Sequence, residues 1–258
     1  MRFASLLLAS ALLLATAYAQ DCSGTDCSVA NFCATCDFDV VIVADTTGSM
    51  GGTINAVKAA ANSLLCRLPN AQFGVSAYRD FPDVLCGSRS EAYVWEIFPI
   101  GGTAAAKQLD RATYQSKVIS LMHGGGCDYP EAALYALQQT CLALDDGGAF
   151  GSSSTRDRVV VLFTDAPDAN DASPTVSDVR AACADAGIRI QVYATSNALA
   201  TSSGLNWNDI NTQYARPTRF SLRTLTTATA AANDIITGLV DLCDRCGNGV
   251  VDPEEECD

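Results

Sequence analysis

Stretches of apolar residues alternate with amphipathic stretches along most of the chain, from residue 38 to residue 242. Residues 38–44 and 158–164 are strand-length segments that are apolar almost throughout, as in strands whose two faces are both buried. Residues 53–67 instead carry apolar side chains at helical spacing, and Pro69 ends this segment. Strands that alternate with helices predict an α/β fold, with a doubly wound, mainly parallel central sheet and helices on both faces.

Other segments continue the alternation. We expect further strands at residues 73–78, 93–99 and 188–195, and further helices at residues 107–122, 130–144, 174–186 and 226–242. Ligands of doubly wound sheets bind at the carboxyl ends of the strands. Asp45 and Asp165 each follow a predicted strand directly, so we expect both at this edge of the sheet although they are far apart in the sequence.

The two ends of the chain differ from this core. Residues 1–20 combine an early arginine, an apolar run and the small-residue sequence Ala17-Tyr18-Ala19, which together are typical of a secretory signal peptide cleaved after Ala19 or Gln20. An uncleaved anchor is the alternative. We interpret residues 21–36 as a cysteine-rich leader, residues 37–243 as one α/β domain, and residues 244–258 as the start of a cysteine-rich repeat that the sequence leaves incomplete.

Composition supports export. All twelve cysteines follow residue 20, and an even number of cysteines in an exported chain indicates disulfides. The formal net charge of −13 at pH 7 argues against nucleic acid and anionic membrane surfaces as partners. Beyond the first twenty residues no segment is apolar for long enough to insert into a membrane. We therefore expect a secreted, extracellular protein.

The candidate chemistry lies in Asp45-Thr46-Thr47-Gly48-Ser49, where a buried strand delivers one carboxylate and hydroxyl groups into a turn. Oxygen ligands of low total charge suit Mg²⁺, or Ca²⁺ with more ligands. Two other acidic loops, at residues 128–131 and 164–168, are placed to complete such a site. The alternative is that Asp45, Thr47 and Ser49 only cap the following helix. Asp168 either rims the site or is simply solvated.

Four sequence blocks occur in order: the strand–Asp-Thr-Thr-Gly-Ser–helix segment, then residues 73–80, 124–132 and 159–167. Together they resemble the von Willebrand factor type A domain, whose D-x-[ST]-x-S motif builds a metal-ion-dependent adhesion site. The third block is most similar to the I-like domain of integrin β subunits. The resemblance spans about residues 38–242 and implies an ion, Mg²⁺ or Mn²⁺, surrounded by Asp45, Thr47, Ser49, Glu131 and Asp165.

The same resemblance implies a neighbouring Ca²⁺ site at Asp80, Asp128 and the backbone of Pro130, although Gly126 stands where the family has an asparagine. The ends of such a sheet lie close together, so Cys36–Cys243 is the first disulfide that we expect. Two other pairings are candidates, Cys66–Cys141 between helices and Cys86–Cys127 between loops.

The function that the resemblance implies is divalent-cation-dependent capture of a partner protein's Asp or Glu carboxylate, in an adhesion or extracellular-matrix module that is not an enzyme. One alternative is a structural coat or matrix protein without a metal-dependent partner. Another is a metal-dependent hydrolase, for which the chain lacks the D-x-D-x-T, P-loop and G-x-S-x-G motifs. The only histidine, His123, is expected in a surface loop.

Overall fold

The computed structural model describes residues 38–68, 71–79, 96–98, 111–125, 131–145, 157–168, 174–184, 186–200, 204–216 and 219–245. These ranges cover most of the expected α/β domain. The expected signal peptide, the cysteine-rich leader and the C-terminal cysteine-rich segment lie outside the described residues, apart from the end of the last helix.

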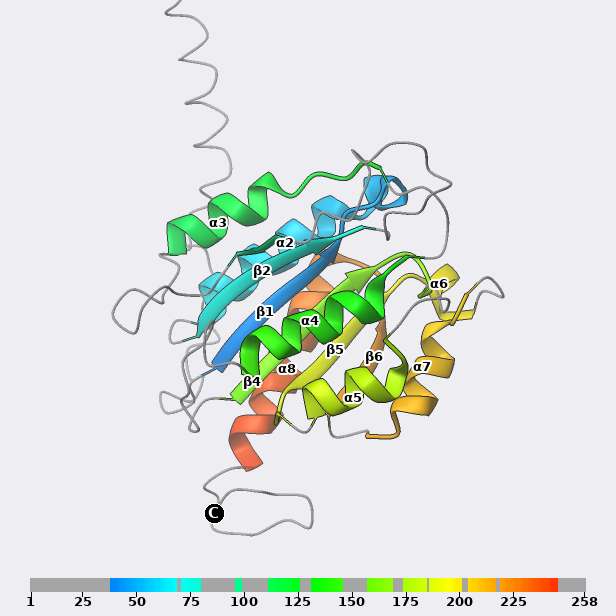
Figure 1. Cartoon of the computed structure of the whole chain (residues 1–258). Helices are drawn as coiled ribbons and strands as arrows, with labels where there is room; N and C mark the ends of the chain where they lie inside the picture. Colours follow the sequence, from blue (N-terminus) through cyan, green and yellow to red (C-terminus); the bar gives the residue numbers. More distant parts are fainter. Residues whose placement is uncertain are drawn as a thin grey trace, which may run out of the picture. The chain divides into compact units, whose positions relative to one another are not determined.

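The described residues form one six-stranded sheet with the strand order β3-β2-β1-β4-β5-β6 (Figure 1). Five strands are parallel and β3, at one edge, runs antiparallel to β2. The strands are β1 (Phe38–Asp45), β2 (Gln72–Tyr78), β3 (Glu96–Phe98), β4 (Asp157–Thr164), β5 (Arg189–Ala194) and β6 (Phe220–Thr224). The central strands β1 and β4 are buried over nearly their whole length, which explains their continuous apolar sequence.

Helices cover both faces of the sheet, as the alternating pattern predicted. One face packs against α4 (Ala133–Asp145), α5 (Val176–Ala184) and α7 (Trp207–Tyr214). On the other face α2 (Ile54–Arg67) packs against both α3 (Arg111–Ser120) and α8 (Ala228–Arg245). Figure 1 shows α4 and α5 in front of the sheet and α8 behind it. The predicted fold class is therefore confirmed.

Two α-helices and one strand of the described residues were not predicted: α6 (Ser196–Ala200), α7 and β6. In addition, α4 begins at Ala133 and not near Pro130, because Glu131 instead forms a bridge with Asp168 on a neighbouring loop. No helix in the described part of the chain is both long enough and apolar enough to cross a membrane.

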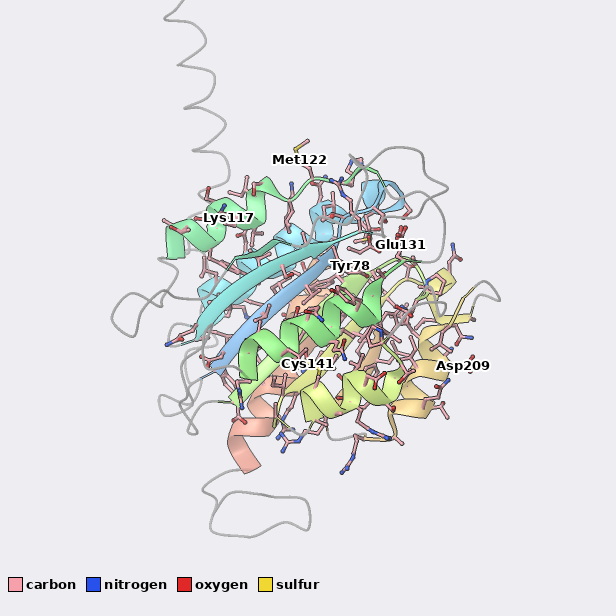
Figure 2. The ribbon with its side chains drawn as sticks, in the orientation of Figure 1. Tyr78, Lys117, Met122, Glu131, Cys141 and Asp209 are labelled. Atoms are coloured by element: carbon pink, nitrogen blue, oxygen red, sulfur yellow. A yellow bond between two sulfur atoms is a disulfide. The ribbon has the colours of Figure 1, made fainter. Side chains whose placement is uncertain are left out.

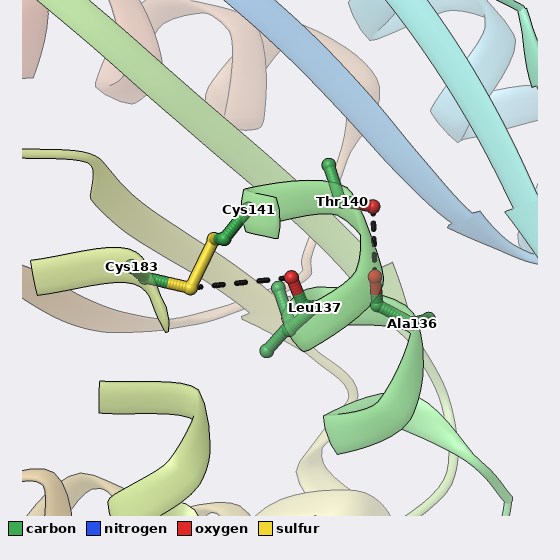
Figure 3. The surroundings of a disulfide bond; sticks show 5 residues. All are labelled: Ala136, Leu137, Thr140, Cys141 and Cys183. Atoms are coloured by element: carbon green, nitrogen blue, oxygen red, sulfur yellow. Dashed lines mark hydrogen bonds between the residues drawn. A yellow bond between two sulfur atoms is a disulfide. The ribbon is translucent and has the colours of Figure 1, made fainter. Parts of the chain in front are cut away.

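A disulfide between described residues joins Cys141 on α4 to Cys183 on α5 (Figure 3). The predicted pairing of Cys141 with Cys66 is wrong, because Cys66 belongs to α2 on the opposite face of the sheet, whereas α5 is the neighbour of α4. The pairing of Cys36 with Cys243 stays a prediction, since Cys36 lies outside the described residues, as do both cysteines of the Cys86–Cys127 pair.

Candidate metal centre

Asp45 is the buried base of the candidate site. It ends β1 beside Thr164, the last residue of β4, and its side chain is fully buried. The backbone N–H and the hydroxyl of Thr47 both donate to Asp45 Oδ1, at 2.9 and 2.7 Å. The hydroxyl of Thr164 donates to Asp45 Oδ2 at 2.9 Å. Three hydrogen bonds therefore set the orientation of this carboxylate.

Ser49 connects the first loop to the loop that follows β4. Its hydroxyl donates to Asp165 Oδ1 at 2.9 Å and lies 3.0 Å from the hydroxyl of Thr47. Because each hydroxyl donates its single hydrogen to a carboxylate, Asp45, Thr47, Ser49 and Asp165 form two hydrogen-bonded pairs whose hydroxyl oxygens lie side by side. The structure brings together four of the five side chains that the resemblance implied as ligands.

The loop that carries Thr47 and Ser49 is positioned by its neighbours. Both the N–H and the hydroxyl of Thr46 donate to the carbonyl of Tyr78, at 2.9 Å each. Gly48 N donates to Gly125 O at 2.8 Å, and a Cβ on Gly48 would lie only 3.2 Å from that oxygen, so the close approach requires glycine.

The helix-capping alternative is not what the loop shows. A short 3₁₀ turn, η2 (Gly48–Gly52), follows the loop, and the side chains at its N-cap, Thr47, and at the N-cap of α2, Thr53, make no capping hydrogen bond. The hydroxyl of Thr47 is directed to Asp45 instead, and that of Ser49 to Asp165. These hydroxyls therefore donate to carboxylates and do not cap a helix.

Glu131 reaches this region from the chain just before α4. Its side chain is 2% exposed, and its backbone N–H donates to Pro167 O at 3.0 Å, next to the Asp165 loop. This backbone contact places Glu131 beside the loop that carries Asp165. Figure 2 labels Glu131 and Tyr78 at the same end of the sheet.

Asp168 has a role that the sequence did not reveal. It is buried, and its Oδ1 accepts a hydrogen bond of 2.7 Å from Leu134 N in the first turn of α4. Its backbone pairs with Leu205 through bonds of 3.0 and 2.9 Å, and with Glu131 through a parallel bridge. Asp168 therefore caps α4 and positions the backbone of Glu131. The only feature of the sequence that pointed to Asp168 was its position three residues after Asp165.

Trp207 holds the same loop from the other side. Its indole N–H donates to Ala166 O at 2.9 Å, and the side chain is fully buried. Trp207 therefore packs, as expected, and also fixes the residue next to Asp165.

The site concentrates negative charge in a region of low solvent access. The pKa of Asp45 is raised to about 6, mainly by burial and also by the nearby Asp165, against the lowering effect of the hydrogen bonds from Thr47 and Thr164. Burial also raises the pKa of Asp165. A bound cation would relieve both effects, since it favours the ionised carboxylates.

Tyr78 lies beneath these groups. Burial raises the pKa of its hydroxyl well above the usual range, and the charges of Asp45, Glu131 and Asp168 act in the same direction. The hydroxyl of Thr164 lies near enough to lower this pKa, but within the described residues no group meets the geometry of a hydrogen bond to the buried Tyr78 hydroxyl. Tyr78 was not singled out from the sequence, because a tyrosine at the end of a buried strand is usually a packing residue.

The donor set fits a hard divalent cation. Within the described ranges no three side chains of the His, Cys, Asp or Glu type converge on one point, so an ion here would need hydroxyl ligands as well as carboxylates. Thr47 and Ser49 supply such hydroxyls beside Asp45 and Asp165, and an all-oxygen set suits Mg²⁺ or Ca²⁺. Asp80, Asp128 and Pro130 lie outside the described residues, so the second, calcium, site stays a prediction.

No family model and no curated protein matches the chain. Two structures of proximal thread matrix protein 1 (PTMP1) from the mussel byssus do match. Both have a TM-score of 0.54 and 12% sequence identity, and both matches cover 81% of this chain. The matches span only 48% and 46% of the mussel chains, about half of their length.

One of the two mussel structures is described as having a zinc-occupied MIDAS motif, the metal-ion-dependent adhesion site. At this level of identity the likeness concerns the fold alone. It agrees with the α/β fold described above. The described part of this chain therefore has a von Willebrand factor type A-like fold, as its four sequence blocks predicted.

Proposed function

We propose that this chain is a secreted protein-binding module of the adhesion or extracellular-matrix type, which captures a partner's Asp or Glu carboxylate through a bound divalent cation. The observation that carries this proposal is the cluster in which Thr47 donates to buried Asp45, Ser49 donates to Asp165, and the two hydroxyl oxygens lie 3.0 Å apart. Hydroxyls and carboxylates from two turns that are distant in the sequence meet there, with their oxygens close together.

Asp45, Thr47, Ser49 and Asp165 would hold the cation, with Glu131 approaching from the start of α4. When bound, the cation supplies an electrostatic attraction for an incoming carboxylate. The residues suit this role because Thr47 and Ser49 contribute no charge, which leaves positive charge on the ion. Asp45 is fully buried whereas Gly48 and Ser49 are exposed, so the site has a closed base and a side open to a partner.

The ion that we favour is Mg²⁺ or Mn²⁺, because the donor set contains only oxygen. One of the two mussel structures has zinc in its MIDAS motif, so titrations of this chain with metal ions should include zinc. A Ca²⁺ ion at the second site would involve Asp80, Asp128 and Pro130.

A structural matrix role without a metal-dependent partner is the second candidate. It is favoured by one observation, that the matching mussel protein is named a thread matrix protein. The two candidates differ in whether a partner carboxylate needs the metal, since a purely structural module gains stability from the ion and binds nothing through it.

The test uses a dense display of the blocked peptide Gly-Gln-Asp-Gln-Gly on a biosensor surface, with the Asn version of the peptide as control. We expect the protein to bind the Asp peptide in Mg²⁺ and to lose this binding in a chelator or in the Asp45→Ala variant. Asp209→Ala, an exposed carboxylate change on α7, is the matched control and should bind normally. Binding that is equal with and without chelator would refute the proposal.

A further inference from the structure

We propose that Arg79 forms a second contact point beside the metal centre, and that the module recognises a segment of its partner with two neighbouring acidic side chains. One acid would occupy the cation and the other would bind the guanidinium of Arg79. This inference rests on the proposed function and names the kind of partner segment that the site fits.

Arg79 is held next to the candidate metal loop. It directly follows Tyr78, whose carbonyl accepts both hydrogen bonds from Thr46, so its backbone is fixed beside the start of that loop. Its Nη1 lies 3.2 Å from the point that a Cβ on Gly125 would occupy. Gly125 in turn accepts the hydrogen bond from Gly48, so one short backbone segment separates the guanidinium from Gly48.

The guanidinium has unused donors. Within the described residues Arg79 forms no ion pair, and its Nε is buried without a hydrogen-bond partner. Other arginines of the domain are engaged: Arg158 donates to Leu144 O and Ala186 O, Arg219 donates to Gly187 O, and Arg223 pairs with Asp234. An arginine has five N–H donors in a fixed planar arrangement, and a buried donor without a partner needs an explanation, for which we propose a ligand of this guanidinium.

The chemistry of this ligand follows from the guanidinium. Its planar fork binds a carboxylate through two parallel hydrogen bonds, which an ammonium group cannot reproduce. The backbone of Gly124 and Gly125 lies between Arg79 and the loop of residues 45–49. Their φ values of +154° and +69° suit glycine. Neither glycine carries a side chain, and among the described residues no atom lies within 4 Å of a Cβ placed on Gly124, which leaves room for a peptide backbone between the two contact points.

The overall charge makes the prediction specific. With a formal net charge of −13, the protein as a whole repels acidic peptides. Additional acidic residues in a peptide should therefore weaken binding unless a local positive group receives one of them. A gain in affinity from flanking acids is consequently diagnostic of a contact such as Arg79.

The experiment compares two blocked peptides, Gly-Gln-Asp-Gln-Gly and Gly-Glu-Asp-Glu-Gly, in Mg²⁺. They differ only in whether the neighbours of the central Asp are amides or acids, on both sides. We expect the acidic neighbours to raise the affinity of the unmodified protein about tenfold, which is the size of one added charge-assisted contact. The gain should disappear in Arg79→Gln and be partly retained in Arg79→Lys.

Arg216→Gln is the matched control, because Arg216 is exposed and precedes β6, away from the carboxyl ends of the strands. It should keep the full gain. Equal Mg²⁺-dependent binding of both peptides, or a gain that persists in Arg79→Gln, would overturn the role of Arg79 while leaving the metal-dependent function intact. Absence of Mg²⁺-dependent binding to either peptide would overturn the proposed function itself.

Discussion

At the scale of single residues, the ionised form of Asp45 that would bind a cation is also the form that destabilises the metal-free domain. Its carboxylate is fully buried and lies near Asp165, so ionisation is unfavourable without a cation. Its pKa rises from 3.8 to about 6 on folding. The folded state thus holds the proton more tightly than the unfolded state, and protonation of Asp45 stabilises the domain.

The sign of the pH effect follows. As pH rises from about 4 through about 6, the metal-free domain loses the stability that protonated Asp45 provides, up to about 3 kcal/mol. Asp45→Asn removes this loss. We expect the variant to be more stable than the unmodified protein at about pH 7 in chelator, by up to about 3 kcal/mol, and nearly equal to it at about pH 4. Chemical denaturation across this range measures the difference, and a difference independent of pH would contradict the assignment.

Tyr78 offers a second test at this scale. Its buried hydroxyl has no partner that meets hydrogen-bond geometry within the described residues. The loss of hydration on folding is therefore not compensated by a hydrogen bond in the protein. In chelator, Tyr78→Phe should leave the free energy of unfolding unchanged or raise it by about 1 kcal/mol. Tyr193→Phe is the control, because the Tyr193 hydroxyl donates to Asp234 at 2.8 Å and its loss should destabilise by about 1 kcal/mol. Equal destabilisation by both changes would show that Tyr78 has a partner.

At the scale of elements, the start of α4 is coupled to the loop after β4. Asp168 caps α4 through Leu134 N and bridges to Glu131, so this one residue links a helix terminus to the metal centre. Asp168→Ala should lower the free energy of unfolding by about 1–2 kcal/mol, as for the loss of a helix cap. It should also weaken Mn²⁺ binding, because Glu131 loses its position.

Asp178 provides the matched control for that change. It accepts hydrogen bonds from the N–H and hydroxyl of Thr175 at the start of α5, and it is remote from the candidate metal loop in the sequence and exposed. Asp178→Ala should reduce stability without altering Mn²⁺ affinity in a titration. Unchanged Mn²⁺ affinity in Asp168→Ala would separate α4 from the metal centre.

The Cys141–Cys183 disulfide tests the packing of α4 against α5. It joins residues 42 positions apart, and a loop of this length predicts a contribution of about 2–4 kcal/mol to stability. Replacing both cysteines with alanine should lower the denaturation midpoint accordingly and leave peptide binding in Mg²⁺ intact, since neither cysteine touches the site. A decrease in the free energy of unfolding of less than about 1 kcal/mol would show that α4 and α5 stay packed together without the disulfide.

At the scale of the whole molecule, the fold was largely predictable because its central strands are buried on both faces. The continuous apolar sequences of β1 and β4 and the helical spacing of α2 are direct consequences of that burial. β6 was missed because it is a short edge strand with only Phe220 buried. α7 was missed although Trp207, Ile210 and Tyr214 are buried at helical spacing and the Asn206 side chain caps its N-terminus.

The candidate site was predictable to the extent that it depends on strand ends. Asp45 and Asp165 follow adjacent parallel strands, and adjacency alone brings them together. Asp168 and Tyr78 could not be found in this way, because their roles arise from contacts between distant segments, such as the pairing of Asp168 with Leu205. The disulfide partner of Cys141 depended on which helix shares its face, and that is a property of the assembled layers.

The central claim is that separate turns of this domain hold one divalent cation. The most direct measurement is the anomalous diffraction of crystals soaked in Mn²⁺, with Asp165→Asn crystals treated identically. We predict a strong peak in contact with the hydroxyls of Thr47 and Ser49 between Asp45 and Asp165, and a weaker or missing peak at that position in the variant. The absence of a peak at this position in crystals of the unmodified protein, or a peak of equal strength in the variant, would contradict the account.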